Sequence, residues 1–211
     1  MSILLELRIC CYPTNTGSNR GEERIQQYVK GLVKFFEYND ILKKHNVDIY
    51  IVDNTIKDGY SLPPEIVAIL PDNVKIITCL NNNFGCKNKG AGDIEQWLYC
   101  KDLIEKYDWF IHFEPRQLLF NFNFINDFLE KPRNLFKTLC NTHFYTGIFA
   151  IETKVLLKFS NAIYLHEMCR LSKSIEYILY DYLIHFKIQF DNREKIELEW
   201  HDVASDSFIP L

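Results

Sequence analysis

A carboxylate and a guanidinium directly follow a strongly apolar segment of this chain. Five bulky residues, Trp109 to Phe113, lead into Glu114, Pro115 and Arg116. A carboxylate can anchor Mg²⁺ or Mn²⁺, and a guanidinium can donate two parallel hydrogen bonds to a phosphate. The pair therefore indicates chemistry on a phosphate-bearing ligand, although a surface ion pair is the plainer interpretation of Arg116.

Two more polar clusters follow predicted strands. One begins at Pro13 and Thr14, after the first apolar segment, and the other is Asp53 and Asn54, after the second. Each cluster alone is typical of any turn. The carboxyl ends of parallel strands meet at one edge of a sheet, so the three clusters together predict one ligand site.

A polar loop, residues 82–92, carries Lys87 and Lys89 just before a predicted helix. The amino terminus of a helix attracts anions, and nearby lysines strengthen that attraction. The loop lacks the GK[ST] sequence of a P-loop. It is a candidate phosphate contact, with a solvated surface loop as the alternative.

These residues need a scaffold, and hydrophobic periodicity predicts one of alternating strands and helices. Asn19 and Glu22 stand at capping-box spacing before the first helix. The predicted strands are 3–11, 47–52, 74–79, 109–113, 135–140, 147–151, 187–190 and 196–200. The first predicted helix follows the Asn19 cap and reaches Phe36, and another follows the loop at 80–97 and runs to about Lys106. The other predicted helices are 63–70, 120–130, 153–159 and 174–186.

Strands that alternate with helices predict βαβ units and a mainly parallel sheet. The chain contains no repeat and no convincing linker, so residues 1–211 are expected to form a single α/β domain. Helices should flank both faces of its mixed, mainly parallel central sheet.

Composition excludes several classes of protein. The chain is 47% hydrophobic and 15% aromatic, which excludes disorder, and its net charge of -4 argues against a nucleic-acid groove. Its seven cysteines form no CxxC pair, which favours reduced thiols. The amino-terminal segment lacks the pattern of a signal peptide, and no apolar run is long enough to span a membrane. A cytoplasmic protein is expected.

The order of these features resembles a known family. A strand ending in Val52-Asp53-Asn54, an asparagine- and glycine-rich loop opening a helix, and an apolar strand ending in Glu114 are similar to the nucleotide-sugar-dependent glycosyltransferases of the GT-A fold. The resemblance spans roughly residues 3–185, and is nearest to the small chlorovirus glycosyltransferase domains that modify capsid glycans. It implies a Rossmann-like GT-A domain, a UDP-sugar donor, a glycan or glycoprotein acceptor, and Mn²⁺ or Mg²⁺.

The resemblance also implies roles for individual residues. Asp53 would contact the uracil base, with Pro13 and Thr14 beside it. Glu114 stands where the family has the first acid of its metal-binding Asp-x-Asp motif, but Arg116 replaces the second acid. The charge of the departing diphosphate would be stabilised either by a metal on Glu114 or by Arg116 itself.

Some members of the family use a late histidine as a further metal ligand. His201 is the candidate here, with Asp202 as a second choice. A lone histidine is more often structural than a ligand, so this assignment competes with a plain structural role.

An inverting glycosyltransferase needs a carboxylate to take the proton of the acceptor hydroxyl. Glu176 is the first candidate, because it begins the helix after a Tyr-Thr-Gly segment, residues 145–147, that resembles the acceptor region of the family. Asp181 is the alternative, and His166-Glu167 the third choice. An acid in a first helical turn also suits the helix dipole, and a retaining enzyme needs no such base.

Two other functions remain open. A sugar-nucleotide pyrophosphorylase has a related sheet, but it should carry a glycine-rich basic loop after the first strand, where this chain offers only Gly17 and Arg20. A catalytically silent module that binds a nucleotide or glycan within a longer polypeptide is the alternative outside enzymology.

Overall fold

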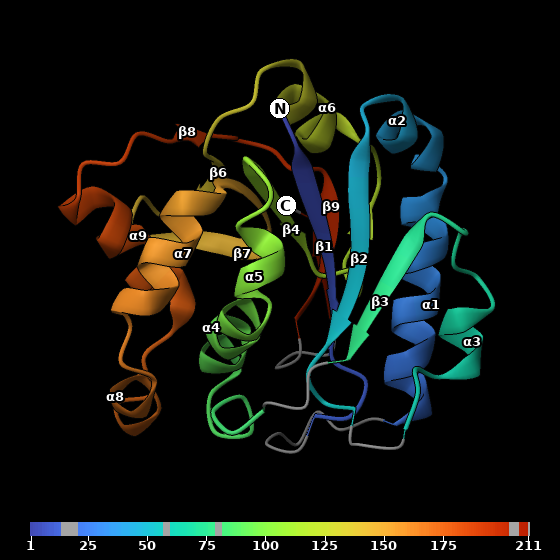
Figure 1. Cartoon of the computed structure of the whole chain (residues 1–211), viewed down its shortest axis with the longest axis horizontal. Helices are drawn as coiled ribbons and strands as arrows, with labels where there is room; N and C mark the ends of the chain where they lie inside the picture. The colour runs from blue at the N-terminus through green and yellow to red at the C-terminus, as the bar shows by residue number, and fades with distance from the viewer. Residues whose placement is uncertain (14–20, 57–59, 79–81, 203–206, 211) are drawn as a thin grey trace.

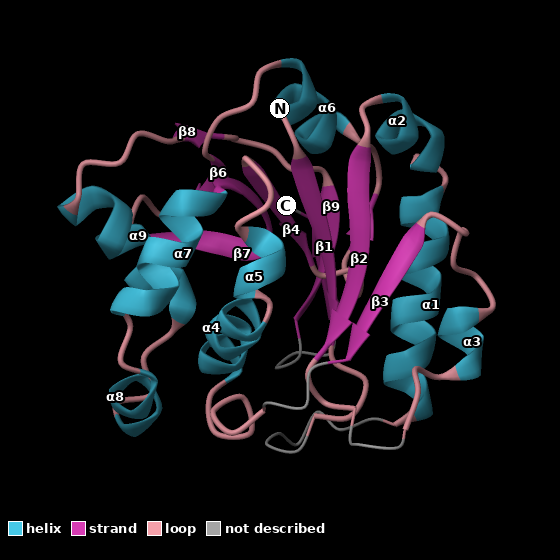
Figure 2. Ribbon diagram, in the orientation of Figure 1, coloured by secondary structure: helices cyan, strands magenta, loops and turns pink. Residues whose placement is uncertain are grey.

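The protein is a layered α/β structure with a central sheet between two sets of helices (Figure 1). The computed structural model describes residues 1–13, 21–56, 60–78, 82–202 and 207–210, with side chains described as far as residue 198. Helices α1, α3 and α6 cover one face of the sheet, and α4, α7 and α9 cover the other (Figure 2).

The described strands are β1 Ile3–Ile9, β2 Val47–Asp53, β3 Val74–Thr78, β4 Trp109–Phe113, β5 Leu118–Leu119, β6 Leu135–Leu139, β7 His143–Glu152, β8 Asp191–Asn192, β9 Leu198–Asp202 and β10 Ser207–Pro210. The described helices are α1 Glu22–Phe36, α2 Asn39–Lys44, α3 Pro64–Val67, α4 Lys89–Tyr99, α5 Lys101–Ile104, α6 Asn123–Glu130, α7 Thr153–Ala162, α8 Leu165–Arg170 and α9 Ile175–His185. Within the described residues, no helix combines the length and apolarity needed to cross a bilayer.

The main sheet has seven strands in the order β3-β2-β1-β4-β7-β6-β8. Strands β1 to β4 are parallel, whereas β7 runs antiparallel to both β4 and β6. This arrangement confirms the predicted mixed, mainly parallel α/β sheet. Ile9 pairs with Asp53 and Leu7 with Phe113, so β1, β2 and β4 all end at the same edge of the sheet.

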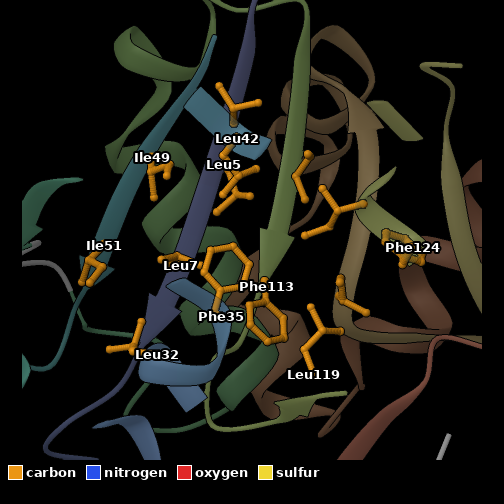
Figure 3. Packing of buried hydrophobic residues seen from close by; sticks show 14 of the residues in the cluster. Leu5, Leu7, Leu32, Phe35, Leu42, Ile49, Ile51, Phe113, Leu119 and Phe124 are labelled. Carbon is orange, nitrogen blue, oxygen red and sulfur yellow. The ribbon is translucent and has the colours of Figure 1, made fainter. Parts of the chain in front are cut away.

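Each face of the sheet carries its own hydrophobic core, because successive side chains of a strand point to opposite faces. On one face, Leu5 and Leu7 of β1 and Phe113 of β4 pack with Leu32 and Phe35 of α1 (Figure 3). The other face is described by a second cluster, in which Leu4 and Phe110 pack with residues of α4, α7 and α9. Two clusters on opposite faces explain why both central strands are apolar at most positions.

The short elements are where sequence-based prediction was wrong. No strand forms at 187–190; instead the two-residue strand β8 follows it and pairs with β6. Helices α2 and α8 and strands β5 and β10 were not predicted. Each of these elements has six residues or fewer, which is too short for hydrophobic periodicity to reveal it. The short strands form through pairing with distant partners.

The first helix begins without the predicted capping box. Gly21 is the residue before α1, with φ of 50°, and no side chain caps the helix there. Asn19, the predicted cap, lies outside the described residues. The helix itself is confirmed, and Tyr28 and Leu32 of the predicted apolar stripe are fully buried. Val33 of that stripe is 50% exposed, and Phe35, which the pattern did not include, is buried instead.

Helix α1 presses closely on the turn that follows β4. A Cβ atom added at Gly31 would lie 1.5 Å from the carbonyl oxygen of Pro115 and 3.3 Å from that of Gln117. The turn is also held by the Glu114 amide, which donates to the Gly147 carbonyl at 2.8 Å. The absence of a side chain at Gly31 therefore lets the helix support the turn that carries Glu114 and Arg116.

We expect Gly31→Ala to lower the free energy of unfolding by roughly 1 to 3 kcal/mol, as other overpacked sites do. Helix propensity alone predicts the opposite sign, since alanine is favoured over glycine in a helix by about 1 kcal/mol. Urea unfolding followed by circular dichroism measures the change. Gln26→Ala, at an exposed position of the same helix, is the control, and a stabilised Gly31→Ala variant would contradict the close contact.

Candidate functional site

A pocket of about 260 Å³ lies at the carboxyl edge of β1 and β4. Its wall comes from the ends of these strands, the start of α4, Thr146 of β7 and the start of α9. The residues that line it are Arg8, Lys87, Asn88, Lys89, Gly90, Asp93, His112, Glu114, Thr146, Ser172, Lys173, Ser174, Ile175 and Glu176. This volume is smaller than that of a typical whole-ligand site, so the pocket fits part of a larger ligand.

Glu114 is buried and surrounded by positive charge. Its Oε1 accepts hydrogen bonds from Arg116, at 3.1 Å from Nη2 and 3.3 Å from Nε, and its Oε2 accepts one from Lys89 Nζ at 3.1 Å. Burial alone would raise the pKa of Glu114, but Lys89, Arg116, Arg8 and Arg24 outweigh it and hold the pKa well below the ordinary value of 4.5. The carboxylate is therefore ionised and fully paired.

A second buried ion pair forms the adjoining wall. Arg8 Nε of β1 lies 2.5 Å from Asp93 Oδ1 of α4, and both side chains are nearly inaccessible to solvent. The two atoms attract as charges but are not aligned as a hydrogen bond. Burial raises the pKa of Asp93 above its ordinary value, although Arg8 and Lys89 oppose that shift.

Beneath these pairs lies a buried polar network. Glu6 of β1 is the cross-strand neighbour of His112 of β4, and His112 Nδ1 lies 2.7 Å from Glu6 Oε2. The same carboxylate accepts hydrogen bonds from Gln96 Nε2 at 2.8 Å and Trp97 Nε1 at 3.1 Å. His112 also lines the pocket, so the network links the core of the sheet to the floor of the site.

Glu176 lies in the first turn of α9 and faces the pocket. One carboxylate oxygen accepts a hydrogen bond from Thr146 Oγ1 at 3.2 Å, and the other accepts one from Ser174 Oγ. Both recorded partners are hydroxyl groups, and no cation from the part of the chain that the structure describes is bonded to Glu176. Its carboxylate is held in one orientation and is the acid of the pocket best suited to accept a proton.

The loop before α4 is held by hydrogen bonds to a carboxylate of α4 and by the side chain of Asn88. The Glu95 side chain accepts hydrogen bonds from the backbone amides of Asn83 and Phe84, each at 2.9 Å. Asn88 caps α4 through the Ala91 amide at 3.0 Å and donates to the Lys173 carbonyl at 2.9 Å. These contacts bring the loop and the residues before α9 together on one side of the pocket.

The structure brings four of the predicted site residues into this pocket: Lys87, Lys89, Glu114 and Glu176. Arg116 lies behind Glu114, 5% exposed, and does not line the pocket. Asp181, the alternative base, is exposed further along α9, away from the residues that line the pocket. His166 and Glu167 belong to α8 and do not line it either.

The predicted base-binding residues lie at the same edge of the sheet but outside the pocket. Asp53 is fully buried, and its carboxylate accepts hydrogen bonds from the Cys11 amide at 2.8 Å and from the amide and hydroxyl of Thr55 at 2.5 and 2.6 Å. Asn54 donates to the Gly92 carbonyl at 3.0 Å. Asp53 thus holds the ends of β1 and β2 together, and its contact with a base stays a prediction.

The remaining predicted residues are described in part or not at all. Pro13 is buried at the end of the described segment that follows β1. Thr14 lies outside the described residues. His201 and Asp202 lie in β9, but their side chains are not described.

Sequence reasoning missed four buried polar residues of this site, as well as Lys173 on its rim. Glu6 and Arg8 on β1, His112 on β4 and Asp93 on α4 are all buried around the pocket. The available signal was an interruption of apolar strands by charged side chains at alternate positions, which places Glu6 and Arg8 on one face. That signal does not identify their partners.

The described surroundings of Glu114 do not fit a divalent metal ion. Both of its oxygens are already bonded to cations, and Arg8 adds a further positive charge nearby. Among the residues whose side chains are described, no three His, Cys, Asp or Glu side chains gather to hold a metal. The metal implied by the family resemblance stays a prediction, and the proposed reaction involves no step on a metal ion.

Comparisons with known proteins identify the fold. No protein-family model and no curated protein matches the chain. A solved structure assigned as a nucleotide-diphospho-sugar transferase from Desulfovibrio desulfuricans G20 is 10% identical, with a TM-score of 0.59 over 92% of this chain and 80% of that one. A structure assigned as a glucose-1-phosphate thymidylyltransferase from Bacillus anthracis is 10% identical, with a TM-score of 0.51 over 91% and 86%.

Mouse xyloside xylosyltransferase 1 also matches, at 8% identity over 91% of this chain and 84% of that one, but its TM-score of 0.43 is too low to support an argument. The protein therefore has the GT-A-like fold that nucleotide-sugar transferases and nucleotidyltransferases share. At these identities the similarity shows the fold alone, so the activity must be argued from the site.

We expect Glu114→Gln to lower the free energy of unfolding at neutral pH by about 3 kcal/mol, because Arg116 loses its buried counterion. The folded-state pKa of Glu114 is depressed, so its stabilisation is complete above its unfolded-state pKa of about 4.5. That contribution is lost as the pH falls below 4.5 and through the lowered folded-state pKa. Urea unfolding of both proteins between pH 7 and pH 3 measures the difference.

Glu105→Gln, at an exposed acid that ends α5, is the matched control, and it should change stability by less than about 0.5 kcal/mol at each pH. A difference between wild type and Glu114→Gln that stays constant down to pH 3 would contradict the lowered pKa of Glu114.

Proposed function

We propose that this protein is a glycosyltransferase that moves a hexose or deoxyhexose from a UDP-sugar to a hydroxyl of a glycan or glycoprotein. The observation that carries this proposal is the pocket at the carboxyl edge of β1 and β4. It combines an acid, Glu176, whose bonding partners among the described residues are hydroxyl groups, with a set of cations that suit a diphosphate. Open α/β sheets bind their ligands at this edge.

The pocket residues divide into two groups by charge. Lys87, Lys89 and Lys173 lie around the start of α4 and before α9, where they would face the phosphates of the donor. The floor is polar, because the almost fully buried Asp93 and His112 line it, each already engaged by a neighbouring side chain.

The proposed reaction needs one base and one leaving group. The oxygen of the acceptor hydroxyl attacks the anomeric carbon of the sugar, and the bond from that carbon to the diphosphate oxygen breaks. The electron pair of that bond leaves with UDP. Glu176 takes the proton of the acceptor hydroxyl, so the sugar is transferred with inversion.

A sugar-nucleotide pyrophosphorylase is the second candidate, because the fold match to the structure assigned as a thymidylyltransferase is nearly as close as the match to the sugar transferase. The two reactions have different products. A pyrophosphorylase joins a nucleoside triphosphate to a sugar phosphate and releases pyrophosphate, whereas a glycosyltransferase releases a nucleoside diphosphate. The loop after β1 that would discriminate between them includes residues 14–20, outside the described structure.

The first test is calorimetric titration with UDP, in parallel with ADP, GDP and dTDP. We expect UDP to bind selectively, and incubation with UDP-glucose or UDP-rhamnose and a panel of glycan acceptors to release UDP, measured by mass spectrometry of both products. Release of pyrophosphate from a nucleoside triphosphate and a sugar phosphate would favour the second candidate. Binding of none of these nucleotides would overturn the proposal.

We expect Glu176→Gln to lower kcat for transfer by about 10²- to 10⁴-fold, the usual contribution of a general base, while the Kd for UDP is unchanged. Asp40→Asn is the control, because Asp40 is an exposed acid in the first turn of α2, which leads into the opposite end of β2. An equal loss of UDP binding would show that Glu176 serves the donor. Transfer that survives in Glu176→Gln but not in Asp181→Asn would assign the base to Asp181.

A further inference from the structure

The acid at the end of β4 is already neutralised by the protein's own side chains. Arg116 bonds to one oxygen of Glu114 through two nitrogens, and Lys89 bonds to the other oxygen. A divalent cation on Glu114 would have to displace one of these groups and would then lie beside the other, with Arg8 also close. The chemistry of this donor set favours an anion next to Glu114 rather than a second cation.

Arg116 is held in place by the packing of its turn. The Gln117 amide donates to the Glu114 carbonyl at 3.0 Å, and α1 contacts the Pro115 carbonyl through the bare Cα of Gly31. The Arg116 side chain is only 5% exposed. Because the turn is packed and the side chain is buried, Arg116 is the permanent counterion of Glu114 in this inference.

Lys89 differs from Arg116 because its side chain is 57% exposed. It is the first residue of α4 and can turn from Glu114 towards a ligand in the pocket without a change in the backbone. Glu114 would still be paired with Arg116 after such a movement. The ammonium group of Lys89 is therefore available to an anion at little cost in unpaired charge.

The rest of the pocket rim is also positively charged. Lys87 and Lys173 line it together with the first turns of α4 and α9, each an 11-residue helix whose amino terminus carries partial positive charge. The buried carboxylate of Asp93 is already engaged by Arg8. Two helix amino termini and three lysines thus line one small pocket, whose wall also includes buried, charged side chains.

We propose that this pocket binds the diphosphate of its nucleotide without a divalent metal ion, and that Lys89, assisted by Lys87, Lys173 and the amino termini of α4 and α9, takes the place of that ion. This inference rests on the proposed function, since it concerns the leaving group of the same reaction. Lys89 moves from Glu114 to the diphosphate, and Arg116 keeps Glu114 neutralised.

The experiment is titration of the full chain with UDP after removal of metals with EDTA, repeated with excess Mg²⁺ or Mn²⁺. We expect the two Kd values to agree within about twofold. Lys89→Met should weaken UDP binding about tenfold or more, the loss expected for one charge-assisted contact. The same variant should leave the Kd for uridine, which has no phosphate, almost unchanged. Lys89→Arg should retain most of the affinity.

Lys101→Met is the matched control, because Lys101 is an exposed lysine at the start of α5, outside the residues that line the pocket. UDP binding that is lost in EDTA and restored by Mn²⁺ would overturn this inference and leave the proposed function standing. Equal loss of UDP and uridine binding in Lys89→Met would also overturn it. Absence of UDP binding under both conditions would instead overturn the proposed function.

Discussion

The site depends on the parallel pairing of β1 with β4. In this register Glu6 lies opposite His112. The next residues on the same face of the sheet, two positions further along each segment, are Arg8 and Glu114. Burial of an unpaired ion costs several kcal/mol, so four ionisable side chains on one buried face of the sheet require partners from the elements that cover them. Gln96, Trp97 and Asp93 of α4 provide partners for Glu6 and Arg8. The packing of α4 on the sheet is therefore set by polar contacts as well as by its apolar face.

Polarity increases along this face from the middle of the sheet to its edge. Glu6 and His112 lie within the core, where Trp97 and Phe149 pack against the imidazole. Glu114 lies at the end of β4, where the starts of α4 and α9 add backbone amides and lysines. A buried carboxylate can stay ionised there only because several cations converge on it, and those cations also create a positive environment for a ligand phosphate. The same charges thus serve both the stability of the edge and its proposed use.

The GT-A-like fold narrows the function without deciding it. Sugar transferases and nucleotidyltransferases share this sheet, and the fold matches carry only about 10% identity. Our proposal of a sugar transferase rather than a nucleotidyltransferase rests on the acids of the pocket. Glu114 is paired with cations and Asp93 with Arg8, whereas Glu176 is bonded to the hydroxyls of Thr146 and Ser174. Among the described residues, the recorded partners of Glu176 are hydroxyl groups, and this acid beside a cationic rim is what supports the proposed transfer to a hydroxyl.

The amino-acid sequence by itself determined the main sheet and its functional edge. The apolar runs of β1, β2 and β4 and the amphipathic pattern of α1 are local signals, and a strand that is buried on both faces can be recognised from its own residues. The convergence of polar turns at one edge follows from parallel strands, which is how Glu114 could be named in advance. Lys87 and Lys89 were named from their place before a helix, and Glu176 from the family resemblance. The short elements α2, α8, β5, β8 and β10 could not, because their stability comes from distant contacts.

Only the tertiary structure decided what these residues do to one another. A charged residue in an apolar strand, such as Arg8, gives no indication that its partner is Asp93, 85 positions away in the chain. The turn sequence Glu114-Pro115-Arg116 is equally compatible with a metal ligand and with an internal ion pair. The folded structure shows an internal ion pair, because Arg116 and Lys89 both lie within hydrogen-bond distance of the buried Glu114. Electrostatic interactions depend on distance and burial, which no local pattern specifies.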